Sequence, residues 1–523
     1  MITLGQFSAW LHAGAARFLG LAIILSGLNT TGASDETNSI RRQSVNLGDC
    51  IQAGLLNNRE LQIERLNPPI ARSFLSAAYG YYDPLFLADT RVESAADSGG
   101  FDPADFSRDA IYSADSEAAR LGLTGFLPGG LNYSLNGVYA HSYGFRNGLN
   151  FDSYSLFGGI SVRQPLLKNF WTDQGRMTIQ VNKKNLRITE LGVVFLTMDV
   201  VNRAEQAYYE LLLANEELRV REQLVETRQQ FLHSVQRKIE MGTLTVLDEQ
   251  LAQAQVATAQ AGANIARNAM VLAENILKTL VGDRWTNTVA IRLQPADPLL
   301  VVPESFNIMK SWERGLAHRA DLAQMKQDVE KSEIDLKYRR NQLFPSLDLV
   351  AGYGRKGADT EQVFPPLTAN ASLNSAFDQV RDGVAPNDMV GIIFSVPLGR
   401  SMERANYRAS KQLREQMRLR VKQQEELVMR EISDALHTAR ASLERVSLTR
   451  RAREFSERAL EAEERKLAGG KSTVFFVLQL QGDLASTQSA ELRAAADYNR
   501  SVSQLAFVEA RTLERRGISI EIK

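Results

Sequence analysis

The sequence predicts a mainly α-helical protein with a membrane β portion. We expect a long antiparallel α-helical coiled-coil barrel joined to a β-barrel sector of four strands per chain. Three observations predict this class. The chain contains an internal two-fold repeat, each half has a long segment with apolar residues at a seven-residue spacing, and each half has two short segments in which apolar and polar residues alternate.

Composition and charge exclude several functional classes. The chain of 523 residues has 61 Lys and Arg residues against 61 Asp and Glu residues, so it has no cationic excess to neutralise the phosphates of a nucleic acid. Its 5 histidines are scattered and Cys50 is its only cysteine, which gives no metal-ligand spacing and no intramolecular disulfide. The sequence has neither a phosphate-binding loop nor a nucleophile elbow. We therefore expect no cofactor and no enzymatic activity.

Residues 1–33 have the pattern of a secretory signal peptide. Arg17 precedes the apolar run Phe18–Leu28, which leads to small residues that end near Ala33. The alternative is an uncleaved apolar tail of a cytosolic protein. No later stretch approaches the roughly 20 apolar residues of a transmembrane helix. Any membrane crossing must therefore use β-strands, since only helices and closed barrels satisfy their backbone groups in lipid.

The internal repeat gives the predicted domain organisation. An offset of 261 aligns Asn46 with Asn307, and an offset of 228 aligns Gly242 with Gly470. Each unit is predicted to run helix, strand, loop, strand, very long helix, turn and helix. The predicted parts after the signal peptide are a first repeat at 45–283, an equatorial linker at 284–305, a second repeat at 306–511 and a C-terminal tail at 512–523.

The longest predicted helices are Arg176–Glu240 and Arg404–Ala468. Neither contains proline, and each would span about 98 Å at about 1.5 Å per residue. Apolar residues recur at seven-residue intervals, as in a coiled coil. In the first long helix these positions are Ala204, Leu211, Leu218, Val225, Leu232 and Ile239. A simple elongated bundle or stalk is the alternative that this spacing leaves open.

Shorter helices are predicted on either side of each long helix. They are Leu47–Tyr79, Val246–Val281, Ile308–Gln342 and Val474–Val508, and each has about half the length of a long helix. Two of them could therefore stack end to end beside one long helix. This arrangement gives a cylinder with strands at one end and helix-turn-helix tips at the other. Pro68-Pro69 must kink or break the first of these helices.

Four segments alternate between apolar and polar residues. They are Pro84–Glu93, Tyr154–Val162, Leu347–Tyr353 and Val390–Val396. This period is typical of transmembrane β-strands, although a half-buried soluble sheet has the same pattern. Because about eight strands are needed to close a barrel, four strands require oligomerisation, and three chains would supply 12 strands.

The long insertion Ala95–Asp152 contains a predicted hairpin. Leu121–Phe126 and Leu131–Tyr139 flank the turn sequence Pro128-Gly129-Gly130. Such a hairpin could project outward or could add two strands to the barrel of each chain. Projection is the favoured interpretation.

With these features the chain resembles the TolC-type outer-membrane efflux family over residues 45–511. The matching motifs are Asn57–Leu61, the strand-closing Gln164-Pro165-Leu166 and Val396-Pro397-Leu398, and the tips Arg237–Asp248 and Arg465–Leu478. The resemblance implies a homotrimer in the outer membrane, with a 12-stranded barrel in lipid and a periplasmic α-barrel. It implies two further partners, a periplasmic adaptor (membrane fusion) protein at the tips and an inner-membrane pump. The segment 284–305 would form part of an equatorial collar.

The resemblance also places candidate site residues at the tips. The predicted adaptor contacts are Arg237, Gly242, Thr243, Gly470, Lys471 and Ser472. The candidate pore constriction consists of Asp248, Phe475, Phe476 and Gln479. Asp248 matches an acidic tip position, whereas constriction aspartates of two family members fall on Phe476 and Gln479. A hydrophobic gate near Phe475 or Phe476 is one interpretation, and ordinary coiled-coil packing is the other.

The predicted function is a passive conduit from periplasm to exterior, as the outer-membrane channel of a tripartite efflux or type I secretion system. A soluble periplasmic coiled-coil adaptor or scaffold is the alternative. The isolated strand pairs between helices favour the channel, because an adaptor would carry compact β-domains around one hairpin.

Overall fold

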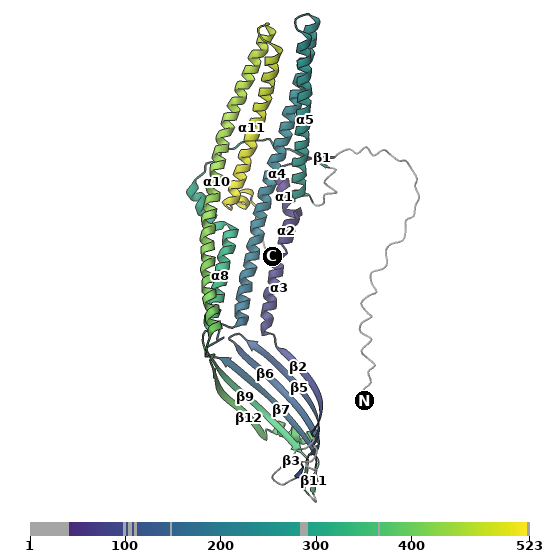
Figure 1. Cartoon of the computed structure of the whole chain (residues 1–523), viewed down its shortest axis with the longest axis vertical. Helices are drawn as coiled ribbons and strands as arrows, with labels where there is room; N and C mark the ends of the chain where they lie inside the picture. The colour runs from purple at the N-terminus through teal and green to yellow at the C-terminus, as the bar shows by residue number, and fades with distance from the viewer. Residues whose placement is uncertain are drawn as a thin grey trace, which may run out of the picture. The chain divides into compact units, whose positions relative to one another are not determined.

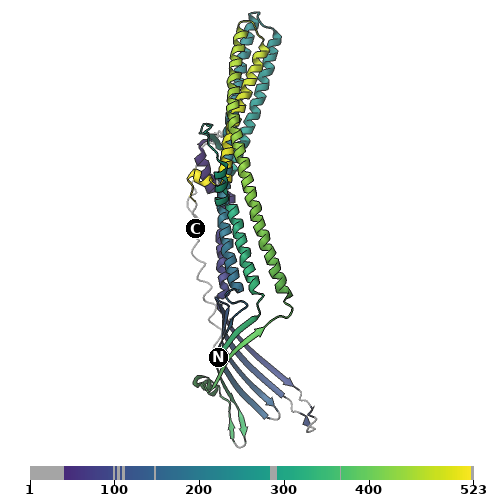
Figure 2. The same cartoon turned by 90° about the vertical axis from the view of Figure 1, so that its left-hand side faces the viewer.

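The computed structural model describes residues 41–97, 101–102, 107–108, 112–146, 149–282, 291–364 and 367–519. Residues 42–523 form one compact unit, whose architecture is shown in Figures 1 and 2. The predicted signal peptide lies outside the described residues. Among the described residues, no helix combines the length and the apolar character needed to cross a membrane.

Two very long helices organise the unit. Helix α4 (Gln174–Glu240) has 67 residues and α10 (Ser401–Ala468) has 68. Each turns back into a helix of about half its length, α5 (Val246–Val281) after α4 and α11 (Val474–Val508) after α10. These four bounds agree with the predicted helices to within three residues. The absence of proline and the seven-residue spacing located the long helices, and the glycine turns located the returning ones.

The half-length helices near the sheet are broken, once beside Pro68-Pro69 as predicted and twice where the sequence predicted continuous helix. Residues 47–79 form α1 (Leu47–Asn57), α2 (Arg59–Glu64) and α3 (Asn67–Tyr79), with Pro68-Pro69 in the first turn of α3, where a missing N–H is tolerated. The predicted helix Ile308–Gln342 is instead α7 (Ile308–His318) and α8 (Ala320–Asn341).

The breaks between α1 and α2 and between α7 and α8 fall on polar residues. Asn58 and Arg319 both have extended backbone, at φ −61° and −65°, and they are separated by the same offset of 261 that aligns Asn46 with Asn307. Asn58 caps α2 through the Leu61 N–H at 3.0 Å. Arg319 is buried, and its guanidinium donates to Asp321 and Glu431. The Asn58 side chain thus replaces one interrupted helical bond, whereas the Arg319 side chain fixes its break through ion pairs.

The seven-residue spacing identifies the packed side of the long helices. Ala204 and Leu211 in α4 and Ile432 and Ala439 in α10 are fully buried. Around Leu211, an apolar cluster joins α4 to α1 and α5 and includes Cys50, which is buried in α1. Complete burial of a leucine side chain stabilises a fold by about 1.5–3 kcal/mol, so these positions carry much of the packing energy.

The sheet has six strands, and the prediction of four strands per chain was wrong. Its order is β12-β9-β7-β6-β5-β2, with antiparallel pairing throughout. The hairpin that was expected to project supplies two of the strands instead, because its long alternating segments pair with the sheet on both sides. The strand bounds are β2 (Leu85–Asp97), β5 (Tyr112–Leu127), β6 (Leu131–Arg146), β7 (Leu149–Pro165), β9 (Ser346–Thr360) and β12 (Ala385–Ser395).

Four helices connect directly to this sheet. The chain enters or leaves it through α3, α4, α8 and α10, whose contacts run in the order α3–α4–α8–α10. Figure 2 shows the strands fanning out from the end of this helical layer. The helix α9 (Leu373–Asp382) packs on β9 and β7 and lies in the loop between β9 and β12.

Short elements complete the fold. Strand β1 (Arg41–Val45) pairs with β8 (Ile291–Pro295). Strand β8 belongs to the predicted equatorial linker, of which residues 284–290 lie outside the described residues. Beside this pair, Asp297 accepts hydrogen bonds from the Leu47 N–H at 2.9 Å and the Tyr208 hydroxyl at 2.7 Å. The remaining short elements are η1 (Gly80–Tyr82), β3 (Phe101–Asp102), β4 (Ser107–Arg108), β10 (Gln362–Phe364), β11 (Leu367–Ala369) and α12 (Thr512–Arg516).

Candidate functional site

The sheet has one apolar face. Residues directly opposite each other in antiparallel strands point to the same side, so register alone defines a row across five strands. This row is Phe86, Leu123, Leu135, Ile160 and Tyr353. Four of the five are at least 46% exposed, the exception being Leu123. A contiguous exposed apolar surface of this kind marks a contact with lipid or with another protein.

The opposite face of the sheet is polar and rich in small residues. Moving one residue along each strand from the apolar row gives Leu87, Gly122, Asn136, Gly159 and Gly354. On the same face, the hydroxyls of Ser134 and Ser161 lie 2.9 Å apart, and Arg163 Nε donates to Asp348 at 2.9 Å. Polar and small residues on this face are what a water-filled lumen requires.

Ionisable residues also lie on the apolar face. Asp388 of β12 lies directly opposite Tyr353, and Arg355 of β9 lies directly opposite Gly158. Others lie near the ends of the strands away from the helices. There His141 Nε2 lies 2.7 Å from Asp152 Oδ1, and the His141 ring stacks on Tyr154 with a centroid distance of 4.1 Å. The helix α9 covers the same end of this face, where Ala376 is fully buried against Gly357. Polar groups therefore border the apolar face at this end, as they do at the edge of a membrane-facing surface.

The two helical tips have the same turn geometry. Gly242 follows α4 with φ +73° and Gly470 follows α10 with φ +69°. In each turn the glycine N–H and the next N–H bond back to helix carbonyls, at 2.8 and 2.9 Å in the first turn and at 3.2 and 2.9 Å in the second. Only glycine adopts this left-handed conformation without steric cost, which explains why the sequence has glycine at both turns.

Most of the predicted adaptor-contact residues are exposed on these turns. Arg237, Gly242, Thr243, Gly470 and Lys471 are exposed, and Ser472 is half-buried. Thr243 donates its hydroxyl to the Lys238 carbonyl at 2.8 Å.

Ser472 is held by a local hydrogen bond. Its hydroxyl donates to Glu463 at 2.5 Å, and this bond, together with the Lys466 ammonium, holds the pKa of Glu463 below its ordinary value. Ser472 therefore fixes its own turn to α10.

Asp248 has a structural role in the first tip. Its carboxylate accepts from the Thr245 N–H at 3.0 Å and from the Thr245 hydroxyl at 2.7 Å, which forms a capping box at the start of α5. No described hydrogen bond, ion pair or ring contact joins Asp248 to the other predicted constriction residues. Within one chain, the Asp248 carboxylate is therefore engaged by the helix cap and not by the other candidates.

The other predicted constriction residues lie on the exposed side of α11. Phe475 and Phe476 are 54% and 52% exposed, their rings meet edge to face at 5.7 Å, and Gln479 is also exposed. Their neighbours Val474 and Leu478 are buried against Val235 and Ala252 of the other hairpin. In the single chain the two phenylalanine rings are therefore not covered by neighbouring helices.

Exposed apolar residues at the first tip were missed from the sequence. Met241, Val246 and Leu247 are 69%, 62% and 73% exposed. They surround the turn and leave it with an apolar surface. At the second tip Lys471 is exposed in the turn, and Phe475 and Phe476 are exposed in the first turn of α11. The sequence does contain a signal for this surface. Turns that face only water are usually polar, so apolar residues directly beside the glycine of a helical turn indicate a contact surface.

Comparison with known proteins decides the family. A family model described as outer membrane efflux protein matches residues 174–283 and 313–508. The chain belongs to the outer membrane efflux protein family. The family is one of channels rather than enzymes, and the protein is an outer-membrane efflux channel. This membership favours the channel over the soluble scaffold. Within the described residues, no group of three or more His, Cys, Asp or Glu side chains could hold a metal ion.

Individual outer membrane efflux proteins resemble the chain over most of its length. Outer membrane efflux protein BepC of Brucella suis biovar 1 (strain 1330) is 24% identical over 348 residues, which cover 65% of this chain and 68% of BepC. The outer membrane protein VceC from Vibrio cholerae matches with a TM-score of 0.61 at 15% identity, covering 88% of this chain and 95% of VceC. The MtrE outer membrane channel of Neisseria gonorrhoeae, in its open state, matches with a TM-score of 0.61 at 14% identity, covering 89% of each chain.

Proposed function

We propose that three copies of this efflux protein assemble into one passive conduit from the periplasm to the exterior. The observation that carries the proposal is the two-faced sheet, whose outer strands β2 and β12 each have one unpaired edge in the single chain. An open sheet edge is not tolerated in lipid, so the edges must be paired by other copies.

The two sides of one chain are suited to join head to tail. On one side β2 follows α3, where Ile70 and Phe74 are 50% and 63% exposed. On the other side β12 precedes α10, where Met402 and Leu413 are 67% and 53% exposed. Two different apolar surfaces on opposite sides form a heterologous interface, which closes into a ring when the rotation permits.

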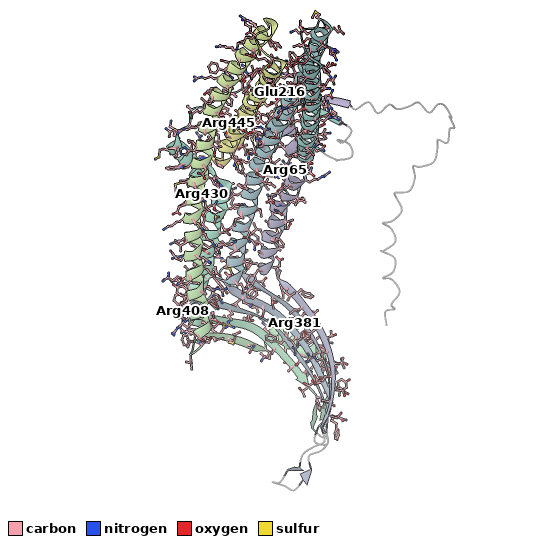
Figure 3. The ribbon with its side chains drawn as sticks, turned by 45° about the horizontal axis from the view of Figure 1, so that its top comes forward. Arg65, Glu216, Arg381, Arg408, Arg430 and Arg445 are labelled. Carbon is pink, nitrogen blue, oxygen red and sulfur yellow. The ribbon has the colours of Figure 1, made fainter. Side chains whose placement is uncertain are left out.

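The tips are proposed to contact a periplasmic adaptor, with an inner-membrane pump supplying the energy. The exposed apolar turn at Met241 and the exposed cationic turn at Lys471 support this assignment. Phe475 and Phe476 are proposed to narrow the pore once three copies meet, because they extend from α11 near the tip. Figure 3 shows charged side chains such as Arg408 and Arg430 along α10, in keeping with a helical portion in water.

The shared turn geometry and the equal offset of the helix breaks support a further part of the proposal. The chain is proposed to consist of two copies of one unit, at 45–283 and 306–511.

The test combines location, mass and conductance. Cells are fractionated, the outer-membrane protein is purified in mild detergent, and its mass is measured by light scattering. We expect a trimer that conducts ions in planar bilayers. Phe74→Asp, at the proposed interface, is expected to give monomers, whereas Leu300→Asp, at a similarly exposed position in the equatorial segment, is expected to remain trimeric. A soluble periplasmic monomer would overturn the proposal.

A further inference from the structure

We propose that the β5–β6 hairpin widens the pore, so that three copies of six strands each close an 18-stranded barrel. This inference rests on the proposed trimeric channel, which would stand without it. It departs from the 12-stranded barrel that the family resemblance implies.

The hairpin is integrated into the sheet along its whole length. Strand β5 pairs with β2 over 13 residue pairs, from Leu85↔Thr124 to Asp97↔Tyr112. Strand β6 pairs with β7 over 15 residue pairs, from Asn132↔Arg163 to Arg146↔Leu149. A hairpin that projected from the barrel would leave β2 paired with β7, and these two strands do not pair here.

The turn of the hairpin is fixed to the base of the helices. The Phe126 ring stacks on Tyr81 with centroids 5.1 Å apart, and the Gln164 amide donates to the Gly129 carbonyl at 3.2 Å. Gly130 lies so close to the loop before α4 that a Cβ there would be 2.7 Å from the Asn169 carbonyl oxygen. These contacts hold the turn at the same level as the other strand ends.

The hairpin also continues both faces of the sheet. Along β6, the residues on the apolar face are Leu131, Tyr133, Leu135, Gly137 and Tyr139. The residues between them, on the polar face, are Asn132, Ser134, Asn136 and Val138. A strand with this alternation is matched to lipid on one side and to water on the other.

The width of the helical layer supports six strands. Strands about 4.8 Å apart and tilted by about 40° each take up about 6 Å of circumference, so six strands cover about 38 Å and four cover about 25 Å. Four packed helices about 8–10 Å apart cover about 32–40 Å. The four helices that join the sheet therefore match a six-stranded sector, and the conduit does not narrow where the helices meet the strands.

The wider barrel changes which part of the conduit limits transport. On the same geometry, 18 strands give a backbone diameter of about 36 Å, against about 24 Å for 12 strands, and about twice the cross-section. The serine and asparagine side chains of its polar face suit hydrophilic solutes. The size limit for cargo is then set by the helical tips and not by the membrane barrel.

The first experiment measures the width of the lumen with thiol-reactive polyethylene glycols of graded size, applied to intact cells. Ser155→Cys, on the polar face of β7, is compared in the full chain and in a variant in which a short Gly-Ser turn replaces residues 98–148. The deletion preserves strand direction, so that β2 can pair with β7. We expect the largest polymer that labels Ser155→Cys to be smaller in the deletion variant. An equal limit in two trimeric proteins would overturn the inference.

A second experiment covers the case in which the deletion variant fails to assemble. In the full chain, a small membrane-impermeant maleimide is applied to Asn136→Cys and Leu135→Cys, which are neighbours on opposite faces of β6. A hairpin in the barrel wall exposes only position 136 to water, so only Asn136→Cys is labelled. A projecting hairpin labels both and overturns the inference, although the trimeric channel would stand. A monomer would instead overturn the proposed function.

Discussion

The turn of the β5–β6 hairpin allows a stability prediction with an internal control. Gly129 and Gly130 both have positive φ, +113° and +88°, so alanine at either position is strained by about 1–3 kcal/mol. A Cβ at Gly129 would meet no atom within 4 Å, whereas at Gly130 it would lie 2.7 Å from the Asn169 carbonyl oxygen and 3.2 Å from the Pro165 ring. Overpacking adds about 1–3 kcal/mol. Gly130→Ala should therefore be less stable than Gly129→Ala by about 1–3 kcal/mol.

This difference is measured by urea unfolding of the two variants in the same detergent, monitored by tryptophan fluorescence. It corresponds to a factor of about 5–150 in the unfolding equilibrium, because about 1.4 kcal/mol is a factor of ten. Both variants carry strain at positive φ, and only Gly130→Ala adds the close contact with the loop before α4. Equal midpoints and equal slopes for Gly129→Ala and Gly130→Ala would refute the docking of the turn.

Three further predictions concern buried or half-buried side chains in the helical portion. Lys278 and Glu274 form a buried ion pair at 2.9 Å, so Lys278→Met should lower the free energy of unfolding by about 3–5 kcal/mol, and adding Glu274→Gln should recover most of it in the same denaturant assay. Burial opposes the ionisation of Asp321, but hydrogen bonds from Arg319 hold its pKa below the ordinary value. The ionised Asp321 carboxylate therefore stabilises the fold fully above its ordinary pKa of about 3.9. This stabilisation is lost as pH falls through the pKa of Asp321 in the folded state. Asp321→Asn should consequently lose less stability than wild type between pH 6 and pH 3, and an equal loss would contradict the assignment. Burial raises the pKa of Cys50 to about 12, so iodoacetamide at pH 8 should modify it only after denaturation, as mass spectrometry would show.

The helical portion was predictable because its signals are local and repeated. Helix α4 begins two residues before the predicted start at Arg176 and ends at the predicted Glu240. Seven-residue spacing and the glycine at Gly242 depend only on nearby residues. The break at Arg319 was not predictable in this way, because it is stabilised by Glu431, which lies on another helix far away in the sequence. Contacts of this kind override the intrinsic preference of a segment for continuous helix.

The tips show the same limit for the candidate site. Exposure of Lys471 and Gly470 follows from the turn, and the sequence places both there. The capping role of Asp248 was also readable, since an acidic residue three positions after Thr245 is the signature of a capping box. The exposure of Phe476 could not be predicted from the sequence, because coiled-coil periodicity does not show which side of a helix its neighbours cover. That depends on the packing of α11 against α5.

The number of strands could not be derived from alternation, but connectivity restricts it. Strand β2 leaves the helical end of the sheet and β7 must return to it, since α4 begins at Gln174 directly beyond β7. Each added antiparallel strand reverses the direction of the chain, so an insertion between β2 and β7 has to add strands in pairs. One hairpin is the smallest such addition, and its turn must lie at the helical end, where Gly130 meets Asn169. Pairs of strands therefore change the circumference in steps of about 13 Å per chain. A four-helix layer about 32–40 Å wide matches a sheet of four strands plus one further pair. A second further pair would make the sheet wider than the helical layer.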